Sequence, residues 1–365
     1  MPRRSLWKCV AIVPLLGLTL WWIHSDTPAS GVSAAPLNGN GIGAPGEQGG
    51  GAGAAARSFR GTGSGFGIGA SPGIDPRVGF DSASFGDPGW RHAALWDDSK
   101  AEFCAYEASW AHYGRLYKGR ALLVLVKEPW NPELDVKADV PARHGFEMLK
   151  LNHLRDVATG IYTYHQMASV FWRRDTGALQ KIAATSEEAC GVSFAEMRRG
   201  KLQTHSYFDG QGDRTQTYPA GAVPEDGLPA ALRDFVAGSA PAFLAVFPSL
   251  LNARFADFAP QIYSLERRTV PAGLAGVPAA AEGAAGLAAV PGAAGAARDP
   301  IPTVEIRLSK EPFQLTYAFE RQPPHRLLRF ERQDGTVYRM VKCERLAYWQ
   351  MNEPGAEAWL PPAVR

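Results

Sequence analysis

Residues 304–319, VEIRLSKEPFQLTYAF, alternate apolar and polar side chains over two successive runs. The apolar positions are Val304, Ile306, Leu308, Phe313, Leu315, Tyr317 and Phe319. Because successive side chains of a β-strand point to opposite faces, a period of two is typical of a strand with one buried face. The stretch therefore predicts two adjacent strands that share a core-facing side.

The next two runs predict a hairpin around a tight turn. They cover residues 326–332 and 336–348, on either side of the pair Asp334-Gly335. An Asp-Gly pair can take the positive φ angles of a two-residue turn, which joins antiparallel strands.

Further strands are predicted upstream, at residues 100–108, 120–127, 146–155, 161–172, 179–185 and 202–208. Short turns that contain Gly or Asp separate them, and short links indicate antiparallel neighbours because a parallel return needs roughly a dozen residues. The fold class is therefore mainly β, a curved antiparallel sheet or partly open barrel of about ten strands. The sequence does not alternate strand and helix patterns as βαβ units do, which argues against a doubly wound nucleotide-binding sheet.

One or two short helices are expected after these strands. Apolar side chains in residues 228–236 recur at helical spacing, with Asp226 placed to cap the start and Gly238 placed to end the helix. Residues 243–258 indicate a second helix, broken at Pro248.

The N-terminus has the pattern of an export signal. A basic start precedes the uncharged run CVAIVPLLGLTLWWI at residues 9–23, which is shorter than the roughly 20 residues of a membrane-spanning helix. Small residues that follow it suit a signal peptidase, whereas Trp21 and Trp22 suit an interfacial anchor. We expect residues 1–34 to be a signal peptide or a signal anchor. The protein is then exported, either periplasmic or anchored to the cytoplasmic membrane and facing outward.

Two blocks rich in Gly, Ala and Pro lack the apolar residues that a core needs. The first is a predicted disordered linker at residues 35–89. The second is a predicted low-complexity insert between two strands, at residues 271–297. Residues 90–353 are predicted to form a single β-rich domain, followed by a C-terminal tail at residues 354–365.

The charge of the chain is nearly balanced. Its 365 residues include 38 Lys and Arg against 36 Asp and Glu, which gives a formal net charge of +2. Nucleic-acid binding needs a basic face, so no nucleic-acid partner is expected. Neither a CxxC pair nor another specific metal or nucleotide motif is present, and we expect no cofactor.

Cys104, Cys190 and Cys343 follow the predicted signal, so at most one intramolecular disulfide can form among them. Cys104 and Cys343 lie in the first and last predicted strands and could pair if these strands close a sheet. The sequence alone leaves the pairing open.

Cys190 is also a weak catalytic candidate. It precedes Gly191, and His205 on a predicted neighbouring strand could serve as its base in a thiol-dependent hydrolase. Cysteine is equally common as a small buried apolar residue, and the surroundings of the known cysteine-protease motifs are missing here.

Asp209 and Asp213 are weak metal candidates on the turn DGQGD. Calcium needs six to eight oxygen ligands and the rest of an EF-hand pattern is missing, so a polar turn is the favoured interpretation. His144, His153 and His165 lack the spacing of a helical metal pair and are expected to be surface or hydrogen-bonded structural residues.

The segment LNHLRDVATGIYTYHQMASVFW predicts a polar and aromatic hairpin. Tyr162, Tyr164 and Trp172 could line a groove for an apolar ligand, as at the mouths of partly open β folds. Strands also favour these residue types for packing alone, which is the alternative. Arg155 and Asp156 are adjacent in a predicted strand, so their side chains should point to opposite faces and should not belong to one site.

The segments KLNHLRDVATGIYTYHQMASVF, TSEEACG and SYFDGQGD together resemble a family of exported bacterial proteins of unknown function. The match covers about residues 100–213 and more loosely the strands up to Cys343. Ala189 stands where the family often has tryptophan, and Asp209 where it often has glutamate. Some members carry a septum-formation-inhibitor label, although the cytosolic nucleotide pyrophosphatases of that name are α/β enzymes. The resemblance implies an exported β-rich protein and no particular activity.

The expected function is that of a non-enzymatic binding or interaction module in the cell envelope. Its partner would be an apolar ligand or another envelope protein, with residues 9–23 as a membrane tether if the signal stays in place. The alternative is a thiol-dependent hydrolase that uses Cys190 and His205.

Overall fold

The computed structural model describes residues 86–361 except for residues 141–142 and 272–300. All described residues belong to one compact unit. Apart from a few boundary residues, the predicted signal, the linker and the low-complexity insert lie outside the described residues.

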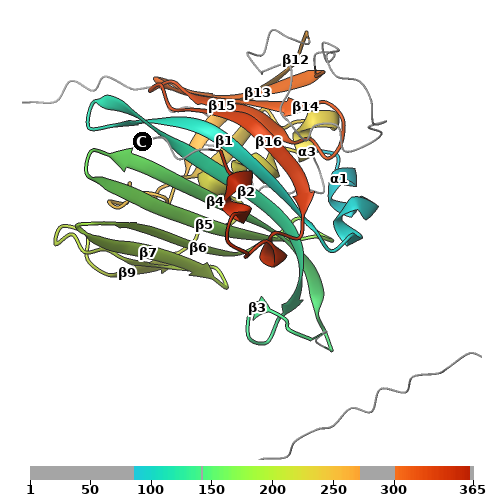
Figure 1. The fold of residues 1–365 in the computed structure, drawn as a ribbon, viewed down its shortest axis with the longest axis horizontal. Coiled ribbons are helices and arrows are strands. Elements are labelled where there is room, and N and C mark those ends of the chain that lie inside the picture. The colour runs from blue at the N-terminus through green and yellow to red at the C-terminus, as the bar shows by residue number, and fades with distance from the viewer. Residues whose placement is uncertain (1–85, 141–142, 272–300, 362–365) are drawn as a thin grey trace, which may run out of the picture. The chain divides into compact units, whose positions relative to one another are not determined.

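One sheet of 16 strands dominates the described part of the chain (Figure 1). Its order is β10-β11-β12-β13-β14-β15-β16-β1-β2-β4-β5-β6-β7-β8-β9, and the short β3 pairs with β2. Only β10 and β11 run parallel; the other pairs are antiparallel. The strands are β1 Ala101–His112, β2 Arg115–Asn131, β3 Val136–Lys137, β4 Phe146–Thr159, β5 Tyr162–Arg173, β6 Leu179–Glu188, β7 Gly191–Arg198, β8 Lys201–His205, β9 Arg214–Thr217, β10 Val223–Pro224, β11 Phe243–Phe247, β12 Gln261–Val270, β13 Thr303–Lys310, β14 Phe313–Glu320, β15 Leu327–Arg332 and β16 Val337–Leu346.

The helical elements are short. They are α1 Gly89–His92, α2 Leu228–Ala231 and α3 Asp234–Ala237, with the 3₁₀ turns η1 Ala94–Asp97, η2 Glu225–Gly227, η3 Tyr348–Gln350 and η4 Ala356–Trp359. Residues 226–236 are all buried, as expected for a helical segment enclosed by other elements. We call residues 225–237 the central segment. None of the helices in the described ranges has the length and apolar character needed to cross a membrane.

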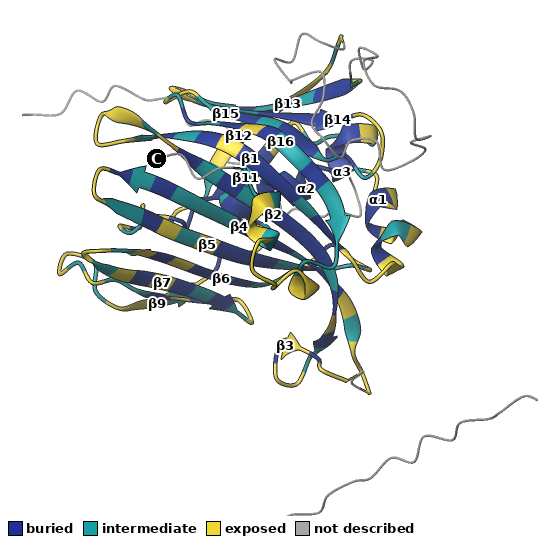
Figure 2. Ribbon diagram, viewed as in Figure 1, coloured by how far each residue is buried: buried dark blue, intermediate teal, exposed yellow. Residues whose placement is uncertain are grey.

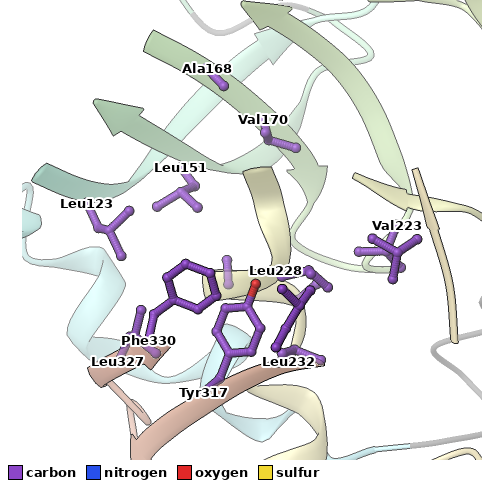
Figure 3. Close-up of a cluster of buried hydrophobic side chains, with 14 of the residues drawn as sticks. Leu123, Leu151, Ala168, Val170, Val223, Leu228, Leu232, Tyr317, Leu327 and Phe330 are labelled. Atoms are coloured by element: carbon purple, nitrogen blue, oxygen red, sulfur yellow. The ribbon is translucent and has the colours of Figure 1, made fainter. Parts of the chain in front are cut away.

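The core lies between the inner face of the sheet and the central segment. Figure 3 shows side chains from both halves of the sheet around Leu228 and Leu232, and the labelled neighbours are Leu123, Leu151, Ala168, Val170, Val223, Tyr317, Leu327 and Phe330. All belong to one cluster of buried residues. The strands alternate between buried and more exposed positions (Figure 2), so one face of each strand supplies the core. The sheet therefore curves around the central segment.

The sequence predicted a mainly β fold, either a curved antiparallel sheet or a partly open barrel of about ten strands. The mainly β class is confirmed, with one open sheet that is antiparallel except for β10 and β11, but the count of about ten strands was too low. The strands that were missed are β3, β7, β9, β10, β11 and β12. Three of them, β3, β9 and β10, have only two to four residues, too few to display a period of two. In β12 the buried residues Tyr263 and Leu265 are followed by exposed charged positions, which hide the alternation.

The helix predicted at residues 243–258 is wrong. Residues 243–247 form β11, which pairs with β10 and β12. Their sequence, FLAVF, is a short apolar run, and periodicity alone cannot assign such a run to helix or strand.

The helix predicted at residues 228–236 is present but divided into α2 and α3. Asp226 does not cap it. Instead its carboxylate accepts hydrogen bonds from Ser249 Oγ at 2.5 Å and from the Leu250 amide at 2.7 Å. Asp226 therefore ties the central segment to the loop after β11.

The two firmest strand pairs are confirmed. Residues 304–319 form the antiparallel pair β13 and β14. The turn at Asp334-Gly335 joins β15 to β16, and Gly335 has a φ of +95°, a value that glycine tolerates without strain.

The chain after β16 packs back on the sheet. Trp359 of η4 lies edge-on against Phe103 of β1, with ring centroids 5.0 Å apart, and its Nε1 donates to Glu344 at 3.2 Å. Part of the predicted C-terminal tail thus covers the outer face of β1.

Candidate functional site

A cavity of about 450 Å³ opens in the inner face of the sheet. Its lining residues lie where the hairpins β1–β2, β4–β5 and β15–β16 turn, and beside the central segment and the loop at residues 249–254. We call it the hairpin-end cavity. Its volume is within the range of roughly 300–1,000 Å³ typical of small-molecule sites.

Aromatic side chains form much of the cavity wall. Trp110 and Phe330 pack edge-on against Tyr338, at centroid distances of 5.6 and 5.2 Å. The ring centroids of Tyr317 and Phe330 are 4.7 Å apart, and Tyr164 lines the cavity from β5. These contacts hold the rings in place, so the wall is formed before any ligand arrives.

A hydrogen-bonded chain lies under this wall. His153 Nδ1 is 3.2 Å from the Asp226 carbonyl oxygen, which can only accept, so Nδ1 carries the proton. His153 Nε2 then accepts from the Tyr338 hydroxyl at 3.0 Å, and Trp110 Nε1 donates to the same hydroxyl at 3.3 Å. Burial, with a smaller effect from the charge of Arg155, lowers the pKa of His153 to about 3. The imidazole is therefore neutral near pH 7.

Three arginines reach the cavity from different elements. Arg155 comes from β4 and donates to the carbonyl oxygen of Leu251. Arg332, at the end of β15, forms an ion pair with Glu225. Arg254 lies in the loop after β11, with its guanidinium 3.9 Å from the ring centroid of Phe208. The cavity thus combines apolar walls with cationic groups.

Of the predicted groove residues, Tyr164 lines the cavity. Its hydroxyl forms a 2.7 Å hydrogen bond with that of Tyr113. Tyr162 stands next to it, 5.7 Å away between ring centroids, and is not among the lining residues. Trp172 is buried elsewhere, against Gly227, where a Cβ atom would lie 2.6 Å from its ring. The structure therefore does not gather the three in one groove.

Cys190 and His205 have separate partners. Cys190 is exposed in the turn between β6 and β7, and its amide donates to Glu188 Oε2 at 2.9 Å. A hydrogen bond to the Glu188 side chain raises the pKa of the Cys190 thiol, which disfavours the reactive thiolate. His205 stacks on Phe194 and pairs with Asp213 at 3.1 Å. No hydrogen bond joins Cys190 to His205 in the part of the chain that the structure describes, and the hydrolase hypothesis stays a prediction.

Asp209 and Asp213 do not converge either. Asp209 accepts from the Gly210 amide at 2.7 Å, whereas Asp213 pairs with His205. Among the described residues, one group has its potential ligand atoms close enough for a metal: Glu102 with Cys104 and Cys343. The two cysteines form a disulfide bond, so they offer no thiolate.

Arg155 and Asp156 lie on opposite faces of β4. Asp156 bonds to Arg120 at 2.7 Å and to His165 at 2.9 Å, whereas Arg155 faces the cavity. His144 is exposed. His153, interpreted from the sequence as a structural residue, lies inside the cavity wall.

Five residues of the cavity could not be connected from the sequence: His153, Arg155, Trp110, Arg332 and Tyr338. A local signal was present on β4, where His153 and Arg155 continue the inward-facing series of Leu149 and Leu151. Polar residues at positions that should be apolar indicate a site when a strand is buried on that face.

Comparisons with models of protein families, with curated proteins and with solved structures found no match. The resemblance to a family of exported bacterial proteins therefore stays a prediction. The cavity is interpreted from its own residues.

Proposed function

We propose that this chain is an exported protein of the cell envelope that binds a small ligand in the hairpin-end cavity and catalyses no reaction. The observation that supports this most is the cavity itself, about 450 Å³ in the inner face of the sheet and lined by aromatic rings. Sites of this size with apolar walls and a few placed polar groups bury most of the surface of a small molecule.

Preorganisation of the wall favours binding. The Tyr338 ring is fixed by edge-on packing against Trp110 and by the hydrogen bond to His153. Side chains that are already immobile lose little conformational entropy when a ligand arrives.

The polar groups of the cavity favour binding over catalysis. His153 has both ring nitrogens engaged and a pKa of about 3, far below the value near 7 that suits a general base. The Ser249 hydroxyl donates to Asp226.

Export is supported by the N-terminal pattern and by one structural feature. Cys104 and Cys343 form a disulfide bond between β1 and β16. Disulfides persist mainly in oxidising compartments such as the bacterial periplasm.

A fluorescence titration with N-phenyl-1-naphthylamine, a neutral apolar dye, tests the site on the full-length protein. We expect saturable binding to the wild type and a loss of at least about tenfold in affinity for Ala253→Trp, which fills the cavity from the loop. Ala256→Trp is the matched control, because Ala256 is exposed in the same loop and does not line the cavity. Equal affinity in both variants would place the dye elsewhere.

A further inference from the structure

The carboxylates that line the hairpin-end cavity already have hydrogen-bond or ion-pair partners. Glu225 pairs with Arg332, and Asp226 accepts hydrogen bonds from Ser249 and Leu250. Asp334, the remaining acidic lining residue, accepts from the Thr336 amide of its own turn at 2.8 Å. Two of the three arginines are therefore left without an acidic partner.

Those two arginines are Arg155 and Arg254. Neither forms an ion pair with a carboxylate among residues 86–361 outside the gaps. Arg155 donates to a backbone carbonyl, and Arg254 lies over the Phe208 ring. The Asp226 carboxylate attracts Arg155 electrostatically from the same cavity, but it forms no ion pair with Arg155 in the described part of the chain. An anion that paired directly with the Arg155 guanidinium would therefore be favoured.

The Nε atoms of Arg155 and Arg332 give independent support. Both are buried and have no hydrogen-bond acceptor. A guanidinium group only donates hydrogen bonds, so the two arginines cannot satisfy one another. Two positively charged guanidinium groups, each with an N–H donor that lacks an acceptor, therefore line the same cavity.

The electrostatic effect of Arg155 reaches its neighbours. Burial, followed by the charge of Arg155, lowers the pKa of His112 and of His153. Burial also lowers the pKa of Arg332, and Arg155 adds to this. The positive potential of Arg155 is thus felt across the cavity.

An apolar surface faces the same space. Trp110, Phe330 and Tyr164 all line the cavity together with Arg155. A bare inorganic anion would leave these rings unused, whereas a molecule with an acidic head and an apolar body would contact both kinds of surface.

We propose that the ligand of the hairpin-end cavity is an organic anion with an apolar body. Arg155 holds the acidic group, a carboxylate or a related oxyanion, through the parallel N–H donors of its guanidinium, and Arg254 assists from the loop. The apolar body packs against Trp110 and Phe330. This inference rests on the proposed function, namely that the cavity binds a small ligand.

Two dyes that differ by one sulfonate test the inference on the full-length protein. They are 8-anilino-1-naphthalenesulfonate and its neutral parent N-phenyl-1-naphthylamine. We expect the sulfonate to bind the wild type at least about tenfold more tightly than the neutral dye. Arg155→Met should remove this difference and leave the neutral dye within about twofold of its wild-type affinity. Added salt should weaken the sulfonate alone.

Arg120→Met is the matched control, because Arg120 lies on the outer face of the neighbouring strand and pairs with Asp156. It should leave both affinities unchanged. Arg254→Met provides a second variant if Arg155→Met does not fold, since Arg254 is exposed in a loop. It should weaken the sulfonate severalfold and spare the neutral dye.

The outcomes separate the two proposals. If both dyes bind with equal affinity and no arginine variant changes this, the cavity binds ligands but the inference of an anionic ligand is overturned. If neither dye binds saturably to the wild type, the proposed function fails as well.

Discussion

Cys104 of β1 and Cys343 of β16 lie directly opposite one another and are joined by a disulfide bond. They are 239 residues apart in the sequence, so the bond closes almost the whole described domain into one loop. Glu102, on the same face of β1, forms a buried ion pair with Arg233 at 2.6 Å. The ion pair therefore attaches the central segment to β1, beside the disulfide that joins β1 to β16.

Removing the disulfide should destabilise the domain. Crosslinks of long loops restrict the unfolded chain, so we expect the double variant Cys104→Ser/Cys343→Ser to lose about 2–5 kcal/mol in the free energy of unfolding. Urea denaturation followed by tryptophan fluorescence measures this. Cys190→Ser is the control and should behave as the wild type, since Cys190 is exposed and unpaired. An unchanged urea midpoint in the double variant would contradict the prediction.

The ion pair between Glu102 and Arg233 should be sensitive to the loss of one partner. Their side chains are only 3% and 2% exposed. Glu102→Gln leaves the Arg233 charge buried without compensation, and we expect a loss of about 3–5 kcal/mol in the free energy of unfolding. Thermal and urea unfolding give the measurement. Glu107→Gln, at an exposed position of the same strand, should change stability little. Comparable losses in the two variants would argue against the buried pair as the cause.

His153 should make stability depend on pH. Its pKa falls from an ordinary value of 6.5 to about 3 in the folded protein. The unfolded chain therefore binds more protons between these values, and the free energy of unfolding falls as the pH is lowered through this window. From pH 7 to pH 5 the wild type should lose about 2 kcal/mol more than His153→Gln. Urea denaturation at pH 7 and at pH 5 measures the free energy of unfolding of both proteins. Equal losses in the wild type and in His153→Gln would show that burial does not lower the pKa of His153.

Gly119 of β2 should not accept a larger residue. A Cβ atom there would lie 2.0 Å from the Asp156 carbonyl oxygen and 2.7 Å from the Trp110 ring. The clash with backbone cannot be relieved by side-chain rotation, so Gly119→Ala should cost about 1–3 kcal/mol or more and displace Trp110 from the cavity wall. Thermal unfolding and the Trp emission maximum report both effects. Gly210→Ala is the control because its Cβ would meet open space; a neutral Gly119→Ala would mean that β2 and β4 can move apart.

Long strands with strict alternation could be predicted from the sequence. β13, β14 and the β15–β16 hairpin were found because their apolar positions repeat every second residue and Asp334-Gly335 joins the last two strands. β10 and β11 could not be found in this way. Their pairing depends on the central segment between them, which is a tertiary effect that local patterns do not contain.

The cavity was predictable only in part. Tyr164 was identified from its aromatic strand, and Arg155 was correctly expected on the face opposite Asp156. What the sequence could not provide is register: Arg332 and Tyr338 approach Arg155 and His153 only because the sheet curves, since β15 and β16 lie four and three positions away from β4 in the strand order. That proximity is set by residues more than 150 positions apart.

The pairing of β1 with β16 also constrains when the domain can complete its fold. β1 stands in the middle of the sheet, yet one of its edges is covered by the last strand to be made. Until β16 arrives, that edge offers unpaired backbone groups to other chains, and contacts so distant in sequence form slowly. In a nascent chain the middle of the sheet therefore stays incomplete until β16 has been made. Truncation before β16 would remove the strand between β15 and β1 and so divide the sheet into two parts.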